Sequence, residues 1–243
     1  MKAMIFAAGL GTRLRPITNT IPKALVPVGG VPMLERIILK MRDAGMGECV
    51  VNAYHFADKV VSFLESKDFG IPVKVSMESG SEPLETGGGI RHAEALLGSG
   101  RFLVHNVDIL SDLDVRNFVA ADRPDSLATL LLVDKEADRY LLFDDDMRLV
   151  GWTNVVTGEV KSPFPDFEPY RYHRYSFCGI HIISDEVFEL MEEWPERFSI
   201  IDFYLKSAAV RPIFGVVATD LNLIDIGSPA KLAEAEEKIL LFE

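Results

Sequence analysis

The chain has 243 residues, of which 48% are hydrophobic and 26% are charged, and its formal net charge is −12. This composition suits one sizeable α/β domain with a packed core and excludes a largely disordered chain. Because nucleic-acid binding depends on clustered Lys and Arg, so acidic a chain is also expected to have no nucleic-acid partner.

The start of the chain predicts a cytoplasmic protein. Residues 2–8 have the pattern of a strand rather than of a secretory signal, and no apolar run approaches about 18 residues, so we expect no membrane partner. Cys49 and Cys178 lie in separate apolar runs without metal-ligand spacing, which favours two buried, reduced thiols.

Strand and helix patterns alternate through the first half of the chain. Short apolar runs predict strands at residues 3–8, 48–52, 72–77 and 102–106. Helical spacing predicts a helix that Pro32 opens and that ends at Gly45, and further helices at residues 56–66 and 88–97. The alternation predicts a doubly wound, mostly parallel α/β sheet, with a long loop at residues 9–31 after the first strand.

The ligand crevice of such a sheet lies beyond the carboxyl ends of its strands. Gly9, Asn52, Glu78 and Asp108 all fall at those ends. We therefore expect the functional site at this edge of the sheet.

The second half is less regular and predicts an antiparallel insertion. Strands are predicted at residues 127–133, 140–143, 149–153, 177–183 and 213–218, with 221–226 as a further candidate, and helices near 185–192 and 200–209. Residues 157–172, rich in proline and aromatic residues, predict a loop that shapes a pocket. The three aspartates at 144–146 predict a solvated hairpin turn rather than a metal cluster. A last helix is predicted from Ser228, with Pro229 at its first position.

The most informative segment follows the first strand. It reads Ala7-Ala8-Gly9-Leu10-Gly11-Thr12-Arg13, and Pro22-Lys23 follows about ten residues later. Its glycines allow close approach of backbone N–H groups to phosphate oxygens, while Arg13 and Lys23 add positive charge. A plain surface turn is the alternative for the glycines alone. The third glycine of a dinucleotide fingerprint and the Gly-Lys-Ser/Thr of a P-loop are both absent.

Two aspartates lie at or near the ends of predicted strands at distant points of the chain. Asp108 ends the predicted strand that begins at residue 102, and Asp225 precedes Gly227-Ser228-Pro229. Mg²⁺ favours one or two protein carboxylates together with phosphate oxygens and water, so a carboxylate such as Asp108 at the end of a central strand suits a magnesium site. Capping or solvent-facing aspartates are the alternative, and only the fold can bring the two together.

A third motif is Glu85-Thr86-Gly87-Gly88-Gly89, at the entrance of a predicted helix. Its N–H groups would suit an anion, and its bare backbone a flat base. A purely structural turn is the alternative.

Together these segments resemble the sugar-phosphate nucleotidyltransferase family. The likeness is strongest over residues 1–110 and 223–232 and weak over 134–176, and the Glu-Thr-Gly-Gly-Gly form is most similar to the N-acetylmuramate 1-phosphate uridylyltransferase branch. The resemblance implies a Rossmann-like fold of the nucleotide-diphospho-sugar transferase type. It also implies Mg²⁺ as cofactor, a nucleoside triphosphate and a sugar 1-phosphate as substrates, and residues 1–243 as a single domain, with 1–110 as the nucleotide-binding half and 111–243 as the sugar-binding half and C-terminal helix.

The resemblance also assigns roles residue by residue. It implies that Arg13 and Lys23 are catalytic, that Asp108 and Asp225 hold the metal, that Ala8, Gly9, Gly11, Thr12, Glu85, Thr86 and Gly87 bind the nucleotide, and that Asn106, Gly179 and Asp202 bind the sugar. The sequence departs from the family pattern at Val107, where the family usually has glycine, and at Leu223, where it often has an aromatic residue.

The identity of the substrates is the most open question. UTP and N-acetylmuramic acid 1-phosphate are preferred, which would place the protein in cell-wall recycling. The alternatives are a mannose, heptose or glucose type of sugar 1-phosphate, phosphocholine, or a regulator that binds a nucleotide sugar without turnover. Arg139, Arg171 and Arg174 are candidates for contact with the sugar phosphate or a lactyl carboxylate, with ordinary surface arginines as the alternative. The second lysine that many family members place on the sugar phosphate has no clear match, and Lys161 is a poorly placed candidate for it. The oligomeric state, monomer or dimer, stays open.

Overall fold

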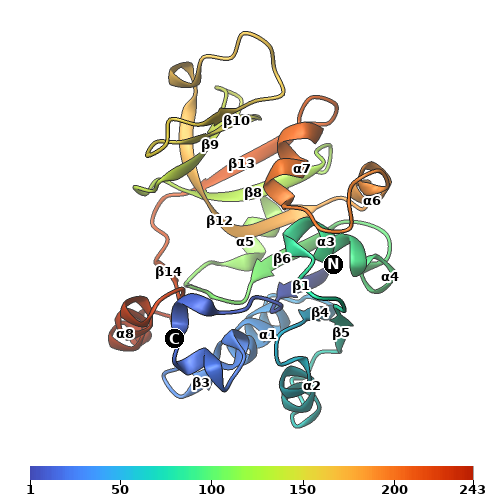
Figure 1. Cartoon of the computed structure of the whole chain (residues 1–243), viewed down its shortest axis with the longest axis vertical. Coiled ribbons are helices and arrows are strands. Elements are labelled where there is room, and N and C mark those ends of the chain that lie inside the picture. Colours follow the sequence, from blue (N-terminus) through green and yellow to red (C-terminus); the bar gives the residue numbers. More distant parts are fainter. Residues whose placement is uncertain (243) are drawn as a thin grey trace.

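A ten-stranded sheet runs through both halves of the computed structural model, which describes residues 1–242 (Figure 1). The strands are β1 (Lys2–Phe6), β2 (Pro27–Val28), β3 (Val31–Pro32), β4 (Glu48–Ala53), β5 (Val73–Met77), β6 (Phe102–Asn106), β7 (Ile109–Ser111), β8 (Ala128–Val133), β9 (Arg139–Phe143), β10 (Leu149–Asn154), β11 (Val160–Lys161), β12 (His173–Ile183), β13 (Ile213–Ala218) and β14 (Leu223–Asp225). The helices are α1 (Met33–Asp43), α2 (Ala57–Glu65), α3 (Glu85–His92), α4 (Glu94–Leu97), α5 (Val115–Ala120), α6 (Val187–Met191), α7 (Ile200–Ser207) and α8 (Pro229–Glu237). Short 3-10 turns are η1 (Thr12–Leu14), η2 (Ile17–Asn19), η3 (Lys23–Leu25), η4 (Pro169–Arg171) and η5 (Ile239–Leu241).

The strand order confirms the doubly wound sheet. Strands follow one another as β11-β10-β9-β12-β6-β1-β4-β5, and β8 joins β12 to β13. β1 pairs in parallel with β4 on one side and with β6 on the other, and β5 extends the β4 side. The chain thus moves outward from β1 to β5 and then returns to the far side of β1. This reversal places the topological switch point between β1 and β6.

The predicted antiparallel insertion is also confirmed. β12 runs antiparallel to β6, β8 and β9, and its register shifts between Phe177 and His181. Gly179, inside this shift, has a φ of 75°, a left-handed conformation that glycine adopts without strain. The bulge lets one long strand serve both the central sheet and the β9–β10 hairpin.

Helices bury both faces of the sheet. Along β1, Ala3 and Ile5 pack with α1, α2, α5 and α8, whereas Met4 packs with α3, α4, α6 and α7. Burial on both faces explains why the central strands are continuous apolar runs rather than alternating ones.

The predicted helix at residues 88–97 is wrong in its bounds. The helix begins at Glu85, so all three glycines lie within it. Ala93 divides it into α3 and α4. The first turn of the helix leaves N–H groups without an acceptor inside the helix. Here the N–H groups of Gly87 and Gly88 both donate to the carbonyl of Phe198, at 2.9 and 3.3 Å, so the helix can begin before the glycines.

Other differences are local. Pro32 ends β3, and α1 begins one residue later, at Met33. The sequence did not predict α5, which Asp114 caps by accepting a hydrogen bond from the N–H of Asn117. The cap of α8 by Ser228 is confirmed. So is the turn after β9, where the N–H groups of Asp146 and Arg148 donate to the Asp144 carboxylate.

Both cysteines are buried and free, as predicted, and burial raises the pKa of each thiol to about 12. Among the helices described over residues 1–242, none is long and apolar enough to cross a membrane.

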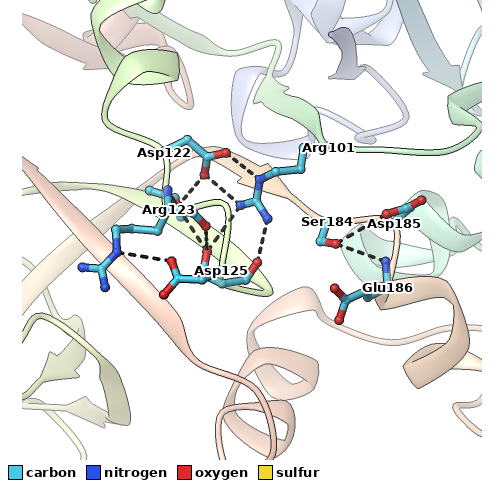
Figure 2. A network of polar contacts seen from close by, with 9 residues as sticks. Arg101, Asp122, Arg123, Asp125, Ser184, Asp185 and Glu186 are labelled. Carbon is cyan, nitrogen blue, oxygen red and sulfur yellow. Dashed lines mark hydrogen bonds and ion pairs between the residues drawn. The ribbon is translucent and has the colours of Figure 1, made fainter.

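A polar network lies at the amino end of β6, on the side of the sheet away from the expected site (Figure 2). Arg101, just before β6, donates from Nε and Nη2 to the two oxygens of Asp122 at 2.5 and 2.7 Å, and Asp122 also accepts from Thr129 Oγ1 at 2.6 Å. The side chains of Arg101 and Asp122 are only 16% and 7% exposed. The pair therefore joins the start of β6 to the connection between α5 and β8.

Removing one member of this pair should destabilise the fold. We expect Asp122→Ala to lower the free energy of unfolding by about 3 kcal/mol, because it leaves a largely buried guanidinium without its carboxylate. Asp125→Ala is the matched control, since Asp125 is 69% exposed and meets Arg123 at 3.5 Å, and it should change stability by less than about 0.5 kcal/mol. Urea denaturation of both variants measures the difference, and equal stabilities would contradict the assignment.

Candidate active site

A cavity of about 230 Å³ lies at the carboxyl ends of the parallel strands. It brings together residues from the ends of β1, β4, β5 and β6, from the loop after β1, and from the start of α3. Its lining consists of Phe6, Ala7, Ala8, Gly9, Lys23, Asn52, Glu78, Pro83, Glu85, Thr86, Asn106, Val107 and Asp108. The cavity thus lies at the expected edge of the sheet, where the strand order reverses.

The backbone after β1 offers free donors to this cavity. Within the described residues 1–242, the N–H groups of residues 8–11 donate to no acceptor. Gly11 has a φ of 62°, and its carbonyl accepts from Thr18 Oγ1 at 2.7 Å. Ala8 and Gly9 line the cavity, and Gly11 and Thr12 continue the same loop beyond it. Such a run of unpaired N–H groups suits an anion.

A buried polar network forms the floor of the cavity. Asn52 Oδ1 accepts from the N–H of Ala7 at 2.8 Å, and Asn52 Nδ2 donates to Glu78 Oε1 at 2.6 Å. Glu78 Oε2 accepts from the N–H of Leu84 at 2.9 Å. Both side chains belong to residues exposed by 5% or less. Sequence reasoning placed these residues at strand ends but gave them no role. The structure uses them to tie β1, β4 and β5 to the start of α3.

The two predicted metal aspartates do come together. β7 continues from Asp108 and pairs antiparallel with β14, so that Asp225 lies opposite Ile109. The N–H of Ile226 donates to the carbonyl of Asp108 at 2.8 Å. This small ribbon fixes side by side two carboxylates that are more than a hundred residues apart in sequence.

The two predicted catalytic cations lie beside this pair. Lys23 Nζ forms an ion pair with Asp108 Oδ2, and both side chains are largely buried. Arg13 Nη2 lies 2.8 Å from the point that a Cβ on Gly227 would occupy, and Asp225 Oδ1 lies 3.0 Å from the same point. Any side chain at position 227 would therefore collide with both Arg13 and Asp225.

The charges at this cluster perturb Asp225. Withdrawal from solvent is the main cause that raises the pKa of its carboxyl group, and the negative charge of Asp108 raises it further. Lys23 and Arg13 act in the opposite direction without cancelling the rise. A carboxylate pair short of positive charge is suited to take up a cation.

These donors fit Mg²⁺ better than a transition metal. Among residues 1–242 no group of three or more His, Cys, Asp and Glu side chains could hold a metal ion. Mg²⁺ needs only one or two protein carboxylates when phosphate oxygens and water supply the rest. Asp108 and Asp225 could supply those two.

The Glu85–Gly87 motif divides between the cavity and the protein interior. Glu85 and Thr86 line the cavity, whereas Gly87 does not. The Gly87 N–H is committed to Phe198, and a Cβ on Gly87 would lie 2.3 Å from the Phe198 ring. The glycine therefore has a packing reason, and its contact with a nucleotide stays a prediction.

The predicted sugar-binding residues occupy two neighbouring places. Asn106 lines the cavity and packs on Gly179, where an added Cβ would lie 2.2 Å from Asn106 Nδ2. Asp202 instead lines a second cavity of about 300 Å³, together with Arg139, Tyr140, Leu141, Trp152, Lys161, Phe177, Ser199, Ile201 and Leu205. A hydrogen bond from the N–H of Ile200 to Thr86 Oγ1 at 2.9 Å links the segments that line the two cavities.

The four basic residues proposed to contact the sugar differ in their surroundings. Lys161 Nζ lies 3.3 Å from Asp202 Oδ1, inside the second cavity. In the part of the chain that is described, the Arg139 guanidinium lines this cavity with no ion pair or hydrogen bond. Arg171 pairs with Glu168, and Arg174 lies 5.1 Å from the centre of the Tyr140 ring. Arg139 and Lys161 are therefore the candidate cations that line this cavity, and of the two Arg139 is the one without an acidic partner among residues 1–242.

Val107 stands where the family that the sequence resembles usually has glycine, and its backbone adopts an ordinary conformation. Val107 is not among the residues with positive φ, it is 4% exposed, and its N–H donates to the carbonyl of Phe6. The side chain simply joins the core.

The chain is similar to known proteins along its whole length. The sequence model of the nucleotidyl transferase family matches residues 2–140. The N-acetylmuramate alpha-1-phosphate uridylyltransferase of Caulobacter vibrioides is 31% identical, over 98% of this chain and 96% of the relative. The D-glycero-alpha-D-manno-heptose 1-phosphate guanylyltransferase of Aneurinibacillus thermoaerophilus is 25% identical, over 98% of both chains. Among solved structures, HddC from Yersinia pseudotuberculosis complexed with GMP-PN has a TM-score of 0.73 at 25% identity, covering 98% of this chain and 99% of that one.

The repulsion between the two aspartates predicts an unusual stability effect. We expect Asp225→Asn to raise the melting temperature of the metal-free protein at pH 7 by about 1–2 °C, because the amide removes a disfavoured charge. The folded-state pKa of Asp225 is raised, so protonation relieves the wild type as pH falls, and the gain of the variant should shrink as pH falls through that pKa.

Thermal unfolding in EDTA at several pH values measures this effect. Asp220→Asn is the control for loss of one negative charge, because Asp220 is an exposed residue outside the cluster. A lower melting temperature for Asp225→Asn would show that Arg13 and Lys23 outweigh the repulsion from Asp108.

Proposed function

The chain belongs to the nucleotidyl transferase family, and we propose that it transfers a nucleotidyl group from a nucleoside triphosphate to a sugar 1-phosphate, with release of pyrophosphate. The observation that carries the proposal is the meeting of Asp108, Asp225, Lys23 and Arg13 beside the free N–H groups of residues 8–11. Positive charge, a carboxylate pair and an anion cradle are the parts that phosphoryl transfer requires.

The triphosphate lies, in this proposal, along the loop after β1. The free N–H groups of residues 8–11 donate to phosphate oxygens, and the nucleoside enters the cavity between Asn52, Glu78 and Thr86. The glycines allow the phosphates to approach the backbone closely, and the Arg13 guanidinium lies beside Gly227, next to the carboxylate pair.

The carboxylate pair supports a magnesium ion. Bound to Asp108 and Asp225, Mg²⁺ would neutralise phosphate charge during the transfer. Lys23 holds the Asp108 carboxylate in place through its ion pair.

The chemical step needs no general base. A sugar 1-phosphate oxygen is already anionic at neutral pH, and it attacks the α-phosphorus in line with the leaving group. The new P–O bond forms as the bond from the α-phosphorus to the bridging oxygen breaks, and pyrophosphate leaves with that electron pair. Positioning and charge stabilisation by Lys23 and Arg13 then account for catalysis.

UTP and N-acetylmuramic acid 1-phosphate are the proposed substrates. Three points support them: the Glu-Thr-Gly-Gly-Gly form, the relative that is 31% identical over nearly the whole chain, and the unpaired Arg139 beside Lys161 in the second cavity. A guanidinium free to form a forked contact suits a sugar that carries a carboxylate. A heptose 1-phosphate with GTP is the second candidate, supported by the 25% identical guanylyltransferase.

The experiment that tests the proposal is pyrophosphate release with Mg²⁺ across five nucleoside triphosphates. The acceptors are N-acetylmuramic acid 1-phosphate, glucose 1-phosphate, mannose 1-phosphate, heptose 1-phosphate and phosphocholine. Release that depends on UTP and the muramic compound supports the full proposal, and release with another pair keeps the reaction and rejects these substrates. Silence with every acceptor, although nucleotide binds, would favour a regulator without turnover.

Lys23 should be essential for turnover but not for folding. We expect Lys23→Ala to lower kcat about 100- to 1,000-fold, because it removes a fixed positive charge from the reacting phosphates. Lys67→Ala is the matched control, since Lys67 pairs with Glu35 on the surface, and it should keep normal kcat. Steady-state pyrophosphate release measures both, and normal kcat for Lys23→Ala would refute the role of Lys23.

Arg139 should matter only for an acidic sugar. We expect Arg139→Ala to raise KM for N-acetylmuramic acid 1-phosphate about tenfold, the size of one lost charge-assisted hydrogen bond. KM for N-acetylglucosamine 1-phosphate, which lacks the carboxylate, should stay within about twofold in the same assay. Equal losses for both sugars would show that Arg139 does not recognise the carboxylate.

A further inference from the structure

Glu85 has a backbone conformation that its side chain disfavours. Its φ is 63°, in the left-handed region that glycine adopts freely and that glutamate rarely adopts. The residue also lines the main cavity, next to Pro83 and Thr86. A strained residue at a cavity wall persists only when its surroundings hold it there.

Arg197 forms an ion pair with the side chain of Glu85. Its Nη2 lies 2.9 Å from Glu85 Oε1, and its Nη1 lies 2.9 Å from Glu82 Oε2. The two terminal nitrogens of one planar group thus join two carboxylates on the same turn of chain. Sequence reasoning missed Arg197, which lies between α6 and α7 without any motif around it.

Backbone bonds align the two segments that Arg197 joins. The N–H of Gly87 donates to the carbonyl of Phe198 at 2.9 Å, and the N–H of Phe198 donates to the carbonyl of Leu84 at 3.3 Å. A Cβ on Gly88 would lie 2.4 Å from the carbonyl oxygen of Glu196, so the segments are in direct contact. The wall made by residues 82–88 is therefore placed by residues 196–200.

We propose that Arg197 is a positioning residue for the nucleoside triphosphate: by holding Glu85 in its left-handed conformation, it fixes the wall of residues 82–88 against the bound nucleoside. The proposal rests on the proposed function, because it takes the main cavity as the nucleotide site. Arg197 itself does not line that cavity, so its effect reaches the ligand through Glu85 and Thr86.

Nucleotide binding at equilibrium is the primary test. The probe is UTP with Mg²⁺, titrated by calorimetry into the full-length chain, or whichever of the five nucleoside triphosphates the wild type binds most tightly. We expect Arg197→Ala to weaken binding about three- to tenfold, the modest effect typical of a partly exposed ion-pair cluster. KM for the nucleotide should rise by the same factor, while kcat and KM for the sugar 1-phosphate stay within about twofold.

Two further variants separate positioning from a merely structural role. Arg197→Lys should show an intermediate loss, because an ammonium cannot bridge both carboxylates as the fork does. Glu85→Gly relieves the backbone strain, so its melting temperature should equal or exceed that of the wild type, although its nucleotide binding is weakened. Adding Arg197→Ala to Glu85→Gly should then weaken binding by less than about twofold, since the two act as one unit.

Arg211→Ala is the matched control. Arg211 forms a similarly exposed pair with Glu186 outside both cavities, and its loss should leave nucleotide binding unchanged. Should Arg197→Ala not fold, Arg197→Lys and Glu85→Gly carry the test by the same criteria. The proposal is overturned if folded Arg197→Ala, or both of these variants, bind nucleotide within twofold of the wild type. Failure of the proposed function gives a different result, namely a wild type that binds nucleotide but releases no pyrophosphate with any acceptor.

Discussion

The candidate active site is built around two like charges, Asp108 and Asp225, that the fold holds next to each other. The β7–β14 ribbon does this with backbone hydrogen bonds, and Ile224 and Ile226 anchor its second strand in the core at 5% and 1% exposure. Because the carboxylates cannot separate, their repulsion remains in the folded protein and adds to burial, the larger cause, in raising the pKa of Asp225. The fold therefore creates a local demand for positive charge in a chain whose net charge is −12.

The long loop after β1 supplies part of that charge by folding back on itself. A Cβ on Gly11 would lie 2.9 Å from Thr18 Cγ2 and 3.2 Å from Lys23 Cβ, so the bare, left-handed glycine lets these residues pack on the start of the loop. Lys23 is then directed to Asp108, while the N–H groups of residues 8–11 stay free. One glycine thus contributes both to the free run of N–H groups and to the placement of Lys23, which gives the motif and the lysine a common structural reason.

Much of this arrangement could be predicted from the sequence. The parallel strands are continuous apolar runs, which predicted the fold class. Gly9, Asn52, Glu78 and Asp108 stand at the ends of these runs, which predicted the edge of the sheet where the cavity lies. The pairing of β7 with β14 and the contacts of Arg197 could not follow, because they join residues more than a hundred positions apart. The bounds of α3 were wrong for a related reason: the Phe198 carbonyl, which closes its first turn, comes from a distant segment.

The glycines at 87–89 show how a ligand motif can have a packing cause. Their missing Cβ atoms leave room for the Phe198 ring, the Glu196 carbonyl and the Glu78 carboxylate, and the N–H groups of the first two glycines are already bonded to Phe198. This close contact brings the wall of the main cavity against the segment that begins α7. Thr86, which lines one cavity, accepts a hydrogen bond from the N–H of Ile200, next to Ser199 in the other, so the two walls are in contact. The motif therefore sets the distance between the two cavities, whichever base and sugar they accept.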